Sequence, residues 1–279
     1  MKVGPQELVA LAAFLKRRSG VIVDASKAYL VEARLAPVMR RHGIDGFPAL
    51  VERIRSGREP ALEQDVLSAM MTHETSFFRD KGPFETVRRM LPELLRRRAV
   101  ARHLVIWSAA ASTGQEAYSL AMILAEHFQE ALAGWSVRIL ATDFSEAVLA
   151  RAREGLYADI EVARGLPQEL RDTNFVRLQG KWSISHECRR RVEFRRLNLI
   201  EPWQGIPPCD IVFLRNVLIY FDIPTRAKIL ERMHGVVRPD GALFLGGAET
   251  MLGVCDRFDR VEGVGCCSYR PRPLRKPPG

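Results

Sequence analysis

Residues 107–116 read Trp107-Ser108-Ala109-Ala110-Ala111-Ser112-Thr113-Gly114-Gln115-Glu116. The first of them complete an apolar run, Leu104–Ala109, and the last open a helical stretch, Gln115–Phe128. A strand, a tight turn and a helix in this order predict a βα unit of a parallel sheet. Such sheets bind their ligands at the carboxyl ends of the strands, which is where this turn lies. The turn is therefore the first candidate for a binding site.

Further short apolar runs alternate with helical stretches along the chain, and together they predict an α/β domain with a parallel sheet. The predicted strands are Leu104–Ala109, Val137–Thr142, Val192–Leu197, Asp210–Leu214 and Ala242–Leu245. The predicted crossover helices are Gln115–Phe128, Glu146–Glu154 and Pro224–Val237. We expect a final antiparallel hairpin over Val261–Arg270, and a small β insertion over 157–190, where turn residues interrupt the pattern.

The first 75 residues have a different pattern, which predicts a small all-helical domain. Glu7–Arg18 places leucines on one face, as an amphipathic helix does. Further helices are predicted over Lys27–Arg41, Phe47–Arg55, Pro60–Met71 and Pro83–Arg98, the last of which leads into the sheet. The expected division is a helical domain over 1–75, an α/β domain over 76–270, and a Pro- and Arg-rich tail or linker over 271–279.

Composition limits the class of protein. No apolar run approaches the roughly 20 residues of a membrane span, and the start lacks the apolar core of a signal peptide, so we expect a cytoplasmic protein. The five cysteines lack CxxC spacing and a histidine placed to complete a zinc site, which predicts reduced thiols and no metal. Lys and Arg outnumber Asp and Glu by 42 to 33. The excess fits solvated helix faces or a landing surface for an acidic protein or nucleic acid, and composition does not choose between them.

The turn after the first strand contains a single glycine, Gly114, so the GxGxxG pattern of dinucleotide sites is absent. A pyrophosphate needs several close backbone approaches at a helix N-terminus, whereas S-adenosylmethionine has no phosphate. Small residues around Gly114 leave room for a methionine moiety, and Glu116 could pair with its α-ammonium group. The alternative is that Glu116 serves only the helix dipole.

Polar residues also follow the next three strands. Asp143 could accept both ribose hydroxyls of an adenosine, or it could cap the helix that follows. Asn198 and Leu199 follow the third strand, where an amide can bind an adenine edge or simply form a turn. Arg215 and Asn216 close a buried strand, and polar groups there must find partners or face a ligand.

Two further segments flank this region, Thr72-His73-Glu74-Thr75-Ser76-Phe77-Phe78-Arg79 and Arg215-Asn216-Val217-Leu218-Ile219-Tyr220-Phe221-Asp222. In the first, Thr75 and Arg79 are poor choices for an apolar helix face, which suggests another role. In the second, Tyr220 could point its hydroxyl into a methyl-transfer channel, or it could be a core aromatic whose hydroxyl is satisfied.

These two segments and the turn between them, in this order, resemble the CheR family of S-adenosylmethionine-dependent protein-glutamate methyltransferases, which methylate chemotaxis receptors. The resemblance extends from about residue 8 to residue 270. It implies a Rossmann-like methyltransferase sheet, S-adenosyl-L-methionine as methyl donor with S-adenosyl-L-homocysteine as product, and no metal. It also implies that the helical domain docks the cytoplasmic helical bundle of chemoreceptors, and that nucleic acid is not a partner.

The resemblance also implies roles for individual residues. Arg79 and Tyr220 match the pair that positions the reacting carboxylate and methyl group. The implied cofactor contacts are His73, Thr75, Arg79, Glu116, Asp143, Asn198, Leu199, Arg215 and Asn216. The chain departs from the family pattern at several places. His73 replaces the usual asparagine, and Gly246-Gly247-Ala248-Glu249 stands where the family has Gly-His-Ser-Glu. The insertion lacks a glycine-rich loop that some members use to grip a receptor tail, so we do not expect tail tethering.

Two other classes compete with this interpretation. The net charge of +9 favours a nucleic-acid methyltransferase, but amino-methylating DNA enzymes need an Asp/Asn-Pro-Pro-Tyr-type loop where this chain has Arg215-Asn216-Val217-Leu218. A non-catalytic module that binds S-adenosylmethionine as a signal is the second alternative, and retention of Arg79 and Tyr220 argues against it. A monomer is expected, because no exposed heptad or repeat stands out.

Overall fold

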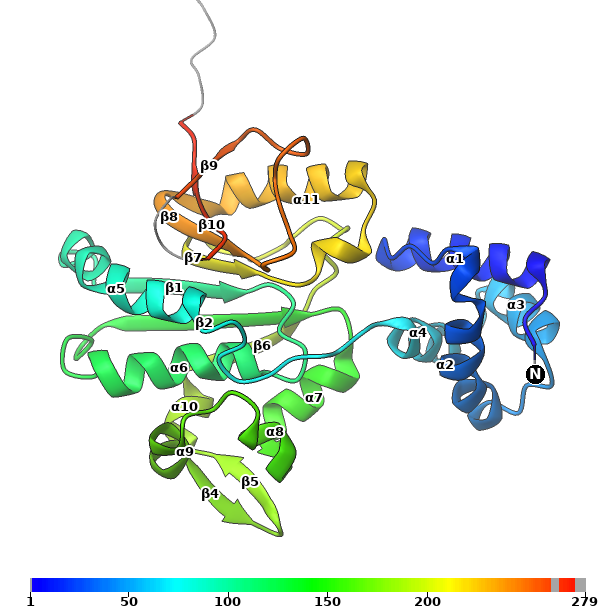
Figure 1. Ribbon diagram of the computed structural model, residues 1–279, viewed down its shortest axis with the longest axis horizontal. Helices are drawn as coiled ribbons and strands as arrows, with labels where there is room; N and C mark the ends of the chain where they lie inside the picture. The colour runs from blue at the N-terminus through cyan, green and yellow to red at the C-terminus, as the bar shows by residue number, and fades with distance from the viewer. Residues whose placement is uncertain (1, 262–265, 274–279) are drawn as a thin grey trace, which may run out of the picture. The chain divides into compact units, whose positions relative to one another are not determined.

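The computed structural model describes residues 2–261 and 266–273, and its ribbon is shown in Figure 1. The chain forms two compact units. Of the described residues, the first unit comprises those up to 73 together with 220–225, and the second comprises 74–219 and those from 226 onward. The assignment of 220–225 to the first unit was not predicted. Within that unit Lys16 Nζ lies 2.8 Å from Asp222 Oδ2, and the Ile22 N–H donates to the Tyr220 carbonyl at 3.0 Å.

The first unit is all-helical up to residue 73, as predicted. Its helices are α1 (Pro5–Ser19), the 3-10 turn η1 (Ala25–Lys27), α2 (Ala28–Arg41), α3 (Phe47–Ser56) and α4 (Pro60–Met70). α1 ends where Gly20 adopts a left-handed conformation with φ of 76°, which glycine reaches without the steric cost of a Cβ. Leu11, Leu15, Leu35 and Leu50 are buried in its core. The four predicted helices are confirmed, with ends shifted by one or two residues.

The second unit contains a seven-stranded sheet with strand order β6-β2-β1-β7-β8-β10-β9. Its strands are β1 (His103–Ser108), β2 (Ser136–Asp143), β6 (Val192–Arg196), β7 (Cys209–Leu214), β8 (Val237–Leu245), β9 (Phe258–Arg260) and β10 (Ser268–Pro271). β6, β2, β1, β7 and β8 pair in parallel, whereas β10 runs antiparallel to both β8 and β9. The predicted α/β class with a parallel sheet is therefore confirmed.

Two strand boundaries were predicted wrongly. The final hairpin pairs 258–260 with 268–271 rather than lying within 261–270, and residues 262–265 fall outside the described part of the chain. β8 begins at Val237, five residues before the predicted start, and it includes Pro239-Asp240-Gly241. The structure accommodates this segment as an irregularity in the β7–β8 register. A Cβ on Gly241 would lie 2.7 Å from the Asp210 carbonyl oxygen, so glycine is needed there.

The main helices of the second unit are α5 (Gly82–Arg97), α6 (Gln115–Phe128), α7 (Glu146–Glu154) and most of α11 (Ile223–Val236), and they flank the sheet (Figure 1). Buried side chains of α5 and α6 join those of the sheet in one hydrophobic cluster, which includes Phe84, Leu120, Ile106 and Phe213. This cluster fixes the sheet whose carboxyl edge carries the candidate site.

The predicted insertion is a three-stranded antiparallel sheet of order β3-β5-β4 with three short helices. Its elements are β3 (Leu156–Tyr157), α8 (Asp159–Ala163), α9 (Gln168–Asn174), β4 (Phe175–Leu178), β5 (Lys181–Ile184) and α10 (His186–Arg190). Phe77 packs edge-to-face on Tyr157 and Phe175, with ring centroids 5.0 and 5.5 Å apart. The insertion is thereby joined to the segment that precedes α5.

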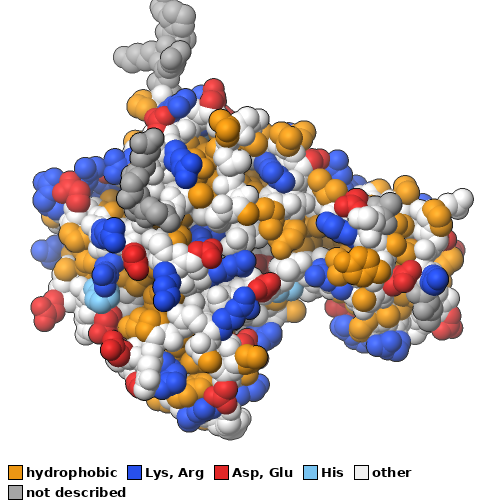
Figure 2. Space-filling view, viewed as in Figure 1, with side chains coloured by type: hydrophobic (Ala, Val, Ile, Leu, Met, Phe, Trp, Pro, Cys, Tyr) orange, Lys and Arg blue, Asp and Glu red, His pale blue; other side chains and the backbone are white. Residues whose placement is uncertain are grey.

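Basic side chains do not gather in one patch on the face that Figure 2 shows. Figure 2 shows Lys and Arg side chains scattered over the visible face among acidic and apolar ones. In the basic cluster at 189–196, Arg190 and Arg191 bind Glu187, and Arg195 binds Glu193. For this cluster the contacts favour a solvated, ion-paired face over a landing surface.

Candidate active site

The carboxyl edge of the central strands carries three charged residues from neighbouring elements. Glu116 lies in the first turn of α6, Asp143 is the last residue of β2, and Arg215 directly follows β7. β1 pairs in parallel with both β2 and β7, so the turn after β1 lies between the other two strand ends. The tertiary structure thus brings together residues that are up to 99 positions apart in the chain.

Arg215 is the centre of this group and is only 5% exposed. Its Nη1 donates to Glu116 Oε2 at 2.9 Å, and its Nη2 donates to Asp80 Oδ2 at 2.7 Å and to the Arg79 carbonyl at 3.0 Å. The Ser108 hydroxyl donates to the other Glu116 oxygen at 2.7 Å. Glu116 is therefore oriented from two sides. Sequence reasoning missed Ser108 and Asp80, since neither stands out from its neighbours along the chain.

The segment 74–81, which crosses to this edge, is held in a strained backbone conformation. Phe78 and Asp80 have φ of 48° and 60°, a region that non-glycine residues seldom adopt without support from their surroundings. Support comes from the Phe78 N–H, which donates to Ser119 Oγ at 3.0 Å, and from Arg79 Nη1, which donates to the Glu74 carbonyl at 3.0 Å. Thr75 lies half-buried in the same segment.

Glu74 ties this segment to the insertion. Its Oε1 accepts a hydrogen bond from Arg164 Nη2 at 2.6 Å. That hydrogen bond, together with the positive charges of Arg164 and Arg79, holds the pKa of Glu74 below its ordinary value. A Cβ on Gly165 would lie 2.2 Å from the Phe77 carbonyl oxygen, so only glycine fits at this contact. The insertion therefore helps to hold the backbone on either side of Thr75.

Asp143 does not cap α7, so the N-cap alternative considered for it is wrong. The N-cap residue of α7 is Ser145. Asp143 instead accepts the Ser112 N–H on Oδ2 at 2.9 Å and the Ser145 N–H on Oδ1 at 3.0 Å. The first of these bonds fixes the turn after β1, where Ser112 has φ of 50°. The Asp143 carboxylate is thus held in one orientation beside the turn.

Asn198 and Leu199 lie just beyond β6. The Asn198 side chain accepts the Ile200 N–H at 3.3 Å and donates to Glu201 Oε1 at 3.0 Å, as a turn-forming asparagine does. Leu199 is buried, and its carbonyl accepts hydrogen bonds from Trp203 Nε1 at 3.1 Å and Arg232 Nη1 at 3.2 Å. These contacts fix the backbone that follows the third parallel strand in the chain.

Asn216 follows Arg215 in a left-handed conformation with φ of 57°. Its backbone N–H donates to Glu249 Oε2 at 2.8 Å. Glu249 received no role in the sequence analysis, although it was noted as part of Gly246-Gly247-Ala248-Glu249. Its contacts link sites 33 residues apart, which no local pattern reveals.

Two of the predicted site residues belong to the helical unit. His73 Nε2 lies 3.3 Å from the Ser68 carbonyl oxygen, and Tyr220 is half-buried in the 220–225 segment. The other predicted residues, including Arg79, belong to the sheet unit. The expected pairing of Arg79 with Tyr220 therefore stays a prediction.

Comparison with known proteins identifies the chain. The family model described as "CheR methyltransferase, SAM binding domain" matches residues 73–265, and "CheR methyltransferase, all-alpha domain" matches residues 6–71. The chain belongs to the CheR methyltransferase family. It is accordingly an S-adenosylmethionine-dependent protein-glutamate O-methyltransferase of the chemotaxis type, and the resemblance seen in the sequence is confirmed. Neither the nucleic-acid methyltransferase nor the non-catalytic alternative is retained.

Several curated relatives are similar over nearly their whole length. Chemotaxis protein methyltransferase 1 of Pseudomonas aeruginosa is 41% identical over 264 residues, covering 93% of this chain and 95% of the relative. Chemotaxis protein methyltransferase Cher2 of Pseudomonas putida is 38% identical over 267 residues, covering 94% and 96%. Chemotaxis protein methyltransferase 1 of Vibrio cholerae is 36% identical over 263 residues, covering 93% and 94%.

The residues at the carboxyl edge of this CheR methyltransferase fit S-adenosylmethionine. The molecule carries a cationic amine and sulfonium, a carboxylate, a ribose diol and an adenine. Glu116 and Asp143 offer carboxylates for the cationic and diol groups. Arg215 offers a cation, and its buried Nε has no hydrogen-bond partner among the described residues. A buried donor of this kind is costly unless something satisfies it, which a bound ligand or a water can do.

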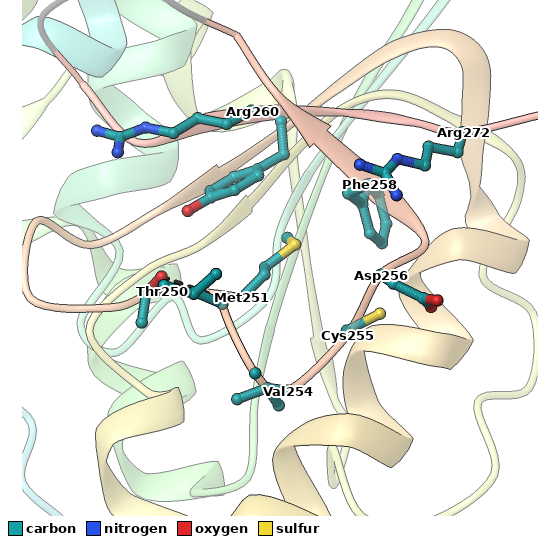
Figure 3. Close-up of a pocket in the computed structure, with 11 residues that line it drawn as sticks. Thr250, Met251, Val254, Cys255, Asp256, Phe258, Arg260 and Arg272 are labelled. Atoms are coloured by element: carbon teal, nitrogen blue, oxygen red, sulfur yellow. Dashed lines mark hydrogen bonds between the residues drawn. The ribbon is translucent and has the colours of Figure 1, made fainter.

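A surface cavity of about 600 Å³ lies in the CheR sheet unit away from these residues. Figure 3 shows Met251 and Phe258 lining it, with Arg260 and Arg272 near its upper side. None of the predicted site residues lines it, so its size does not make it the methyl-transfer site. In the described residues no helix is long and apolar enough to cross a bilayer. The same residues contain no group of three His, Cys, Asp or Glu side chains placed to hold a metal ion.

Proposed function

We propose that this CheR methyltransferase binds S-adenosylmethionine at the carboxyl edge of its sheet and methylates receptor glutamates there. The observation that carries the proposal is the ion pair between the buried Arg215 and Glu116, which shares this edge of the sheet with Asp143. The proposed cofactor contacts are His73, Thr75, Arg79, Glu116, Asp143, Asn198, Leu199, Arg215 and Asn216.

Glu116 binds the α-ammonium group in this proposal. A carboxylate has about four acceptor positions, and the hydrogen bonds from Ser108 and Arg215 occupy two of them. Those two bonds also fix the side chain, so it loses little rotational freedom when the ligand arrives. Arg215 places its own cation where the ligand's carboxylate can be attracted.

Asp143 binds the ribose hydroxyls. Each of its oxygens already accepts one backbone N–H, which orients the carboxylate and leaves acceptor positions for hydroxyl donors. Asn198 and Leu199 bind the adenine, Asn198 through its amide and Leu199 through its backbone. Asn216, in its left-handed conformation, presents its side chain to the methionine moiety.

In this proposal the enzyme catalyses the reaction by aligning the receptor carboxylate with the methyl group of the cofactor. When bound, S-adenosylmethionine supplies an electrophilic methyl group. A glutamate carboxylate has a reference pKa of about 4.3 and is deprotonated at neutral pH, so no general base is required. Arg79 attracts and orients the receptor carboxylate through a charge-assisted hydrogen bond. Tyr220 holds the reacting centre with its hydroxyl oxygen and ring. Holding the reacting atoms in line supplies the rate enhancement.

The helical unit docks the receptor bundle. Residues 1–60 carry 11 Lys and Arg against 6 Asp and Glu. Between α1 and α3 lies a groove of about 190 Å³ lined by Leu11, Phe14, Val51 and Ile54. The exposed residues Arg17 and Arg55 also line this groove. An apolar floor beside two cations suits an acidic amphipathic helix of a receptor.

Methyl transfer to a purified receptor cytoplasmic fragment tests the catalytic assignment. We expect Arg79→Ala to lower kcat by at least about 100-fold, because the carboxylate loses its orienting cation. Calorimetry should give a smaller loss in S-adenosylmethionine affinity. Arg88→Ala, which removes an exposed arginine of α5, is the matched control and should behave as wild type. Full activity of Arg79→Ala would refute the role of Arg79.

Charge reversal tests the docking assignment separately. Arg17→Glu combined with Arg55→Glu should raise the KM for the receptor by about 10-fold or more at low salt, where surface charges act most strongly. Affinity for S-adenosylmethionine should stay unchanged. The double variant Arg88→Glu and Arg89→Glu changes the same charge on α5 and should leave the receptor KM near wild type. Equal effects of the two double variants would show that net charge, not this groove, governs docking.

A further inference from the structure

Glu249 lies in the loop after β8 and is only 5% exposed. Its carboxylate accepts four backbone N–H groups from two loops. Oε2 accepts from Asn216 at 2.8 Å and Gly246 at 2.7 Å. Oε1 accepts from Val217 at 2.9 Å and Leu218 at 2.7 Å. Every hydrogen-bond donor to this carboxylate among the described residues is a backbone amide, so peptide dipoles stabilise the buried charge.

These bonds join the loops that follow two neighbouring strands, β7 and β8. Space at the junction is tight. A Cβ on Gly246 would lie 2.6 Å from Asn216 Nδ2 and 2.8 Å from Glu249 Oε2. The loop after β8 therefore approaches the Asn216 side chain as closely as glycine permits.

The bonds also support an uncommon backbone conformation. Asn216 has φ of 57°, a left-handed conformation that asparagine adopts more readily than most non-glycine residues. Its N–H and the next two are all bound to one carboxylate. The last of them, on Leu218, belongs to the first residue of the 3-10 turn η2 (Leu218–Tyr220). Glu249 thus acts on the backbone of Asn216 and on the start of the turn that contains Tyr220.

We propose that Glu249 is a positioning residue for methyl transfer, whose carboxylate locks residues 216–218 in the conformation that the reaction uses. The inference rests on the proposed function, because it takes Asn216 as a cofactor contact and Tyr220 as part of the reacting centre. Glu249 itself touches neither substrate. It acts through the backbone of the loop.

The geometry makes an unusual demand on the side chain. Both oxygens must be acceptors, because each receives two N–H groups. Glutamine has the shape of glutamate but offers an NH₂ group in place of one oxygen. Whichever way the amide turns, its NH₂ would face two N–H donors and leave both without an acceptor. Glu249→Gln should therefore impair the enzyme as severely as Glu249→Ala, which is not the usual result for an isosteric change.

Steady-state kinetics of the full chain with a receptor cytoplasmic fragment test the proposal. For Glu249→Gln we expect kcat to fall by at least about 30-fold and the Kd for S-adenosylmethionine to rise by about 10-fold. Assays run at a temperature where circular dichroism shows each variant folded. Asp240→Asn is the matched control, because Asp240 is a carboxylate bound to Arg98 at the other end of the sheet. It should lose stability with kcat and Kd unchanged.

Wild-type kcat and Kd in folded Glu249→Gln would overturn the inference. Hydrogen exchange of the wild-type protein keeps the test decisive even if this variant does not fold. The backbone amides of residues 216–218 and Gly246 should exchange slowly with S-adenosylmethionine bound, and rapid exchange of these amides would also overturn it.

Asn216→Ala separates failure of this inference from failure of the proposed function. If Asn216→Ala weakens S-adenosylmethionine binding while folded Glu249→Gln keeps both the wild-type Kd and the wild-type kcat, the cofactor contact stands and the inference is refuted. If Asn216→Ala binds S-adenosylmethionine as wild type does, the proposed cofactor contact fails. In that case a fall in kcat of Glu249→Gln still supports positioning, through the turn that contains Tyr220.

Discussion

Strand β7 carries a buried charge at each end, and the two ends are built differently. Asp210 lies at the amino end and is 0% exposed, and Arg215 follows the carboxyl end and is 5% exposed. Each pairs with groups of opposite charge. Buried ion pairs contribute little net stability, so two such networks on one strand need another explanation.

At the amino end every guanidinium nitrogen of Arg98 donates a hydrogen bond. Nε donates to Asp210 at 2.9 Å, and Nη1 and Nη2 donate to the two oxygens of Asp240 at 3.0 and 2.6 Å. The second oxygen of Asp210 accepts the Val105 N–H at 2.8 Å. The hydrogen bond to Asp240 is the main cause that raises the pKa of Arg98 above its ordinary value. This network ties α5 to the sheet.

At the carboxyl end the network is incomplete. Arg215 leaves its Nε without a hydrogen bond among the described residues. The side chains of its partners Glu116 and Asp80 are 13% and 54% exposed, so solvent or a ligand can reach them. Arginine–carboxylate pairing therefore stabilises the fold at the amino end of β7, whereas at the carboxyl end it leaves polar groups available for binding. Ligand sites in parallel sheets lie at the carboxyl ends of the strands, which agrees with this difference.

The largest effect is expected at the amino end. Arg98→Met leaves the fully buried Asp210 with a single arginine, Arg238, whose Nε lies 3.3 Å from Asp210 Oδ1. The free energy of unfolding should therefore fall by about 3 kcal/mol. S-adenosylmethionine affinity of the folded protein should stay the same. Urea unfolding and calorimetry measure the two quantities. Arg96→Met, which breaks an exposed pair with Glu93, should cost less than about 1 kcal/mol. Equal losses from both variants would contradict the structural role of Arg98.

The next largest effect is expected at the carboxyl end of β7, on cofactor affinity rather than on stability. Arg215→Met should weaken S-adenosylmethionine binding by about 10- to 100-fold, because a hydrogen bond to a charged group contributes about 1.5–3 kcal/mol. Its loss of stability should be smaller than that of Arg98→Met, since water can solvate Glu116 and Asp80. Calorimetry at pH 7 gives the affinity. If Arg215→Met lost stability but no affinity, the two ends of β7 would be equivalent.

A smaller change sharpens the account of the carboxyl end. Ser108→Ala removes one of the two side chains that orient Glu116. A single such hydrogen bond contributes about 1 kcal/mol, so the Kd for S-adenosylmethionine should rise about fivefold. Thr142 is the matched control, because its hydroxyl accepts a hydrogen bond from Trp107 Nε1 within the sheet. Thr142→Val should lower stability and leave the Kd unchanged.

The smallest effect concerns acid pH at the amino end. The hydrogen bond from Arg98 is the main cause that lowers the pKa of Asp240 in the folded protein. A lowered folded pKa adds stability above the unfolded value of about 3.9, and this stability is lost as the pH falls below it. The difference in unfolding free energy between wild type and Asp240→Asn should thus be largest above about pH 5 and shrink below about pH 4. Because Asp240 is partly exposed, this difference in unfolding free energy should stay under about 1 kcal/mol. A difference that does not change with pH would contradict the ionic pairing.

Much of the fold was predictable because its signals are local. Gln115–Phe128 and Glu146–Glu154 were predicted with the boundaries that the structure shows. The predicted sheet strands differ from the observed ones mainly at their ends. The start of β8 was missed because Pro239 and Gly241 are residues that usually interrupt strands, whereas here they lie in an irregular part of one. The polar residues at the strand ends could also be chosen from the sequence, since parallel strands all end at one edge.

The candidate site was predictable as a set of residues but not as a set of contacts. The sequence left Asp143 as a ligand or an N-cap. The structure rules out the N-cap and shows that Asp143 also fixes the turn at Ser112. No role was predicted for Ser108, Asp80 or Glu249. Each of these residues acts through a partner that folding brings near, and the type of a residue does not reveal which partner that is.

By itself, the sequence determined the elements, their order and the membership of the CheR family, because these depend on hydrophobic periodicity and on short motifs along the chain. Only the tertiary structure decided that Arg215 meets Glu116 across 99 residues and that four N–H groups from two loops converge on Glu249. The physical reason is that hydrogen bonds and ion pairs act over about 3 Å in space. Which groups come that close is set by how the strands pair and the loops between them pack.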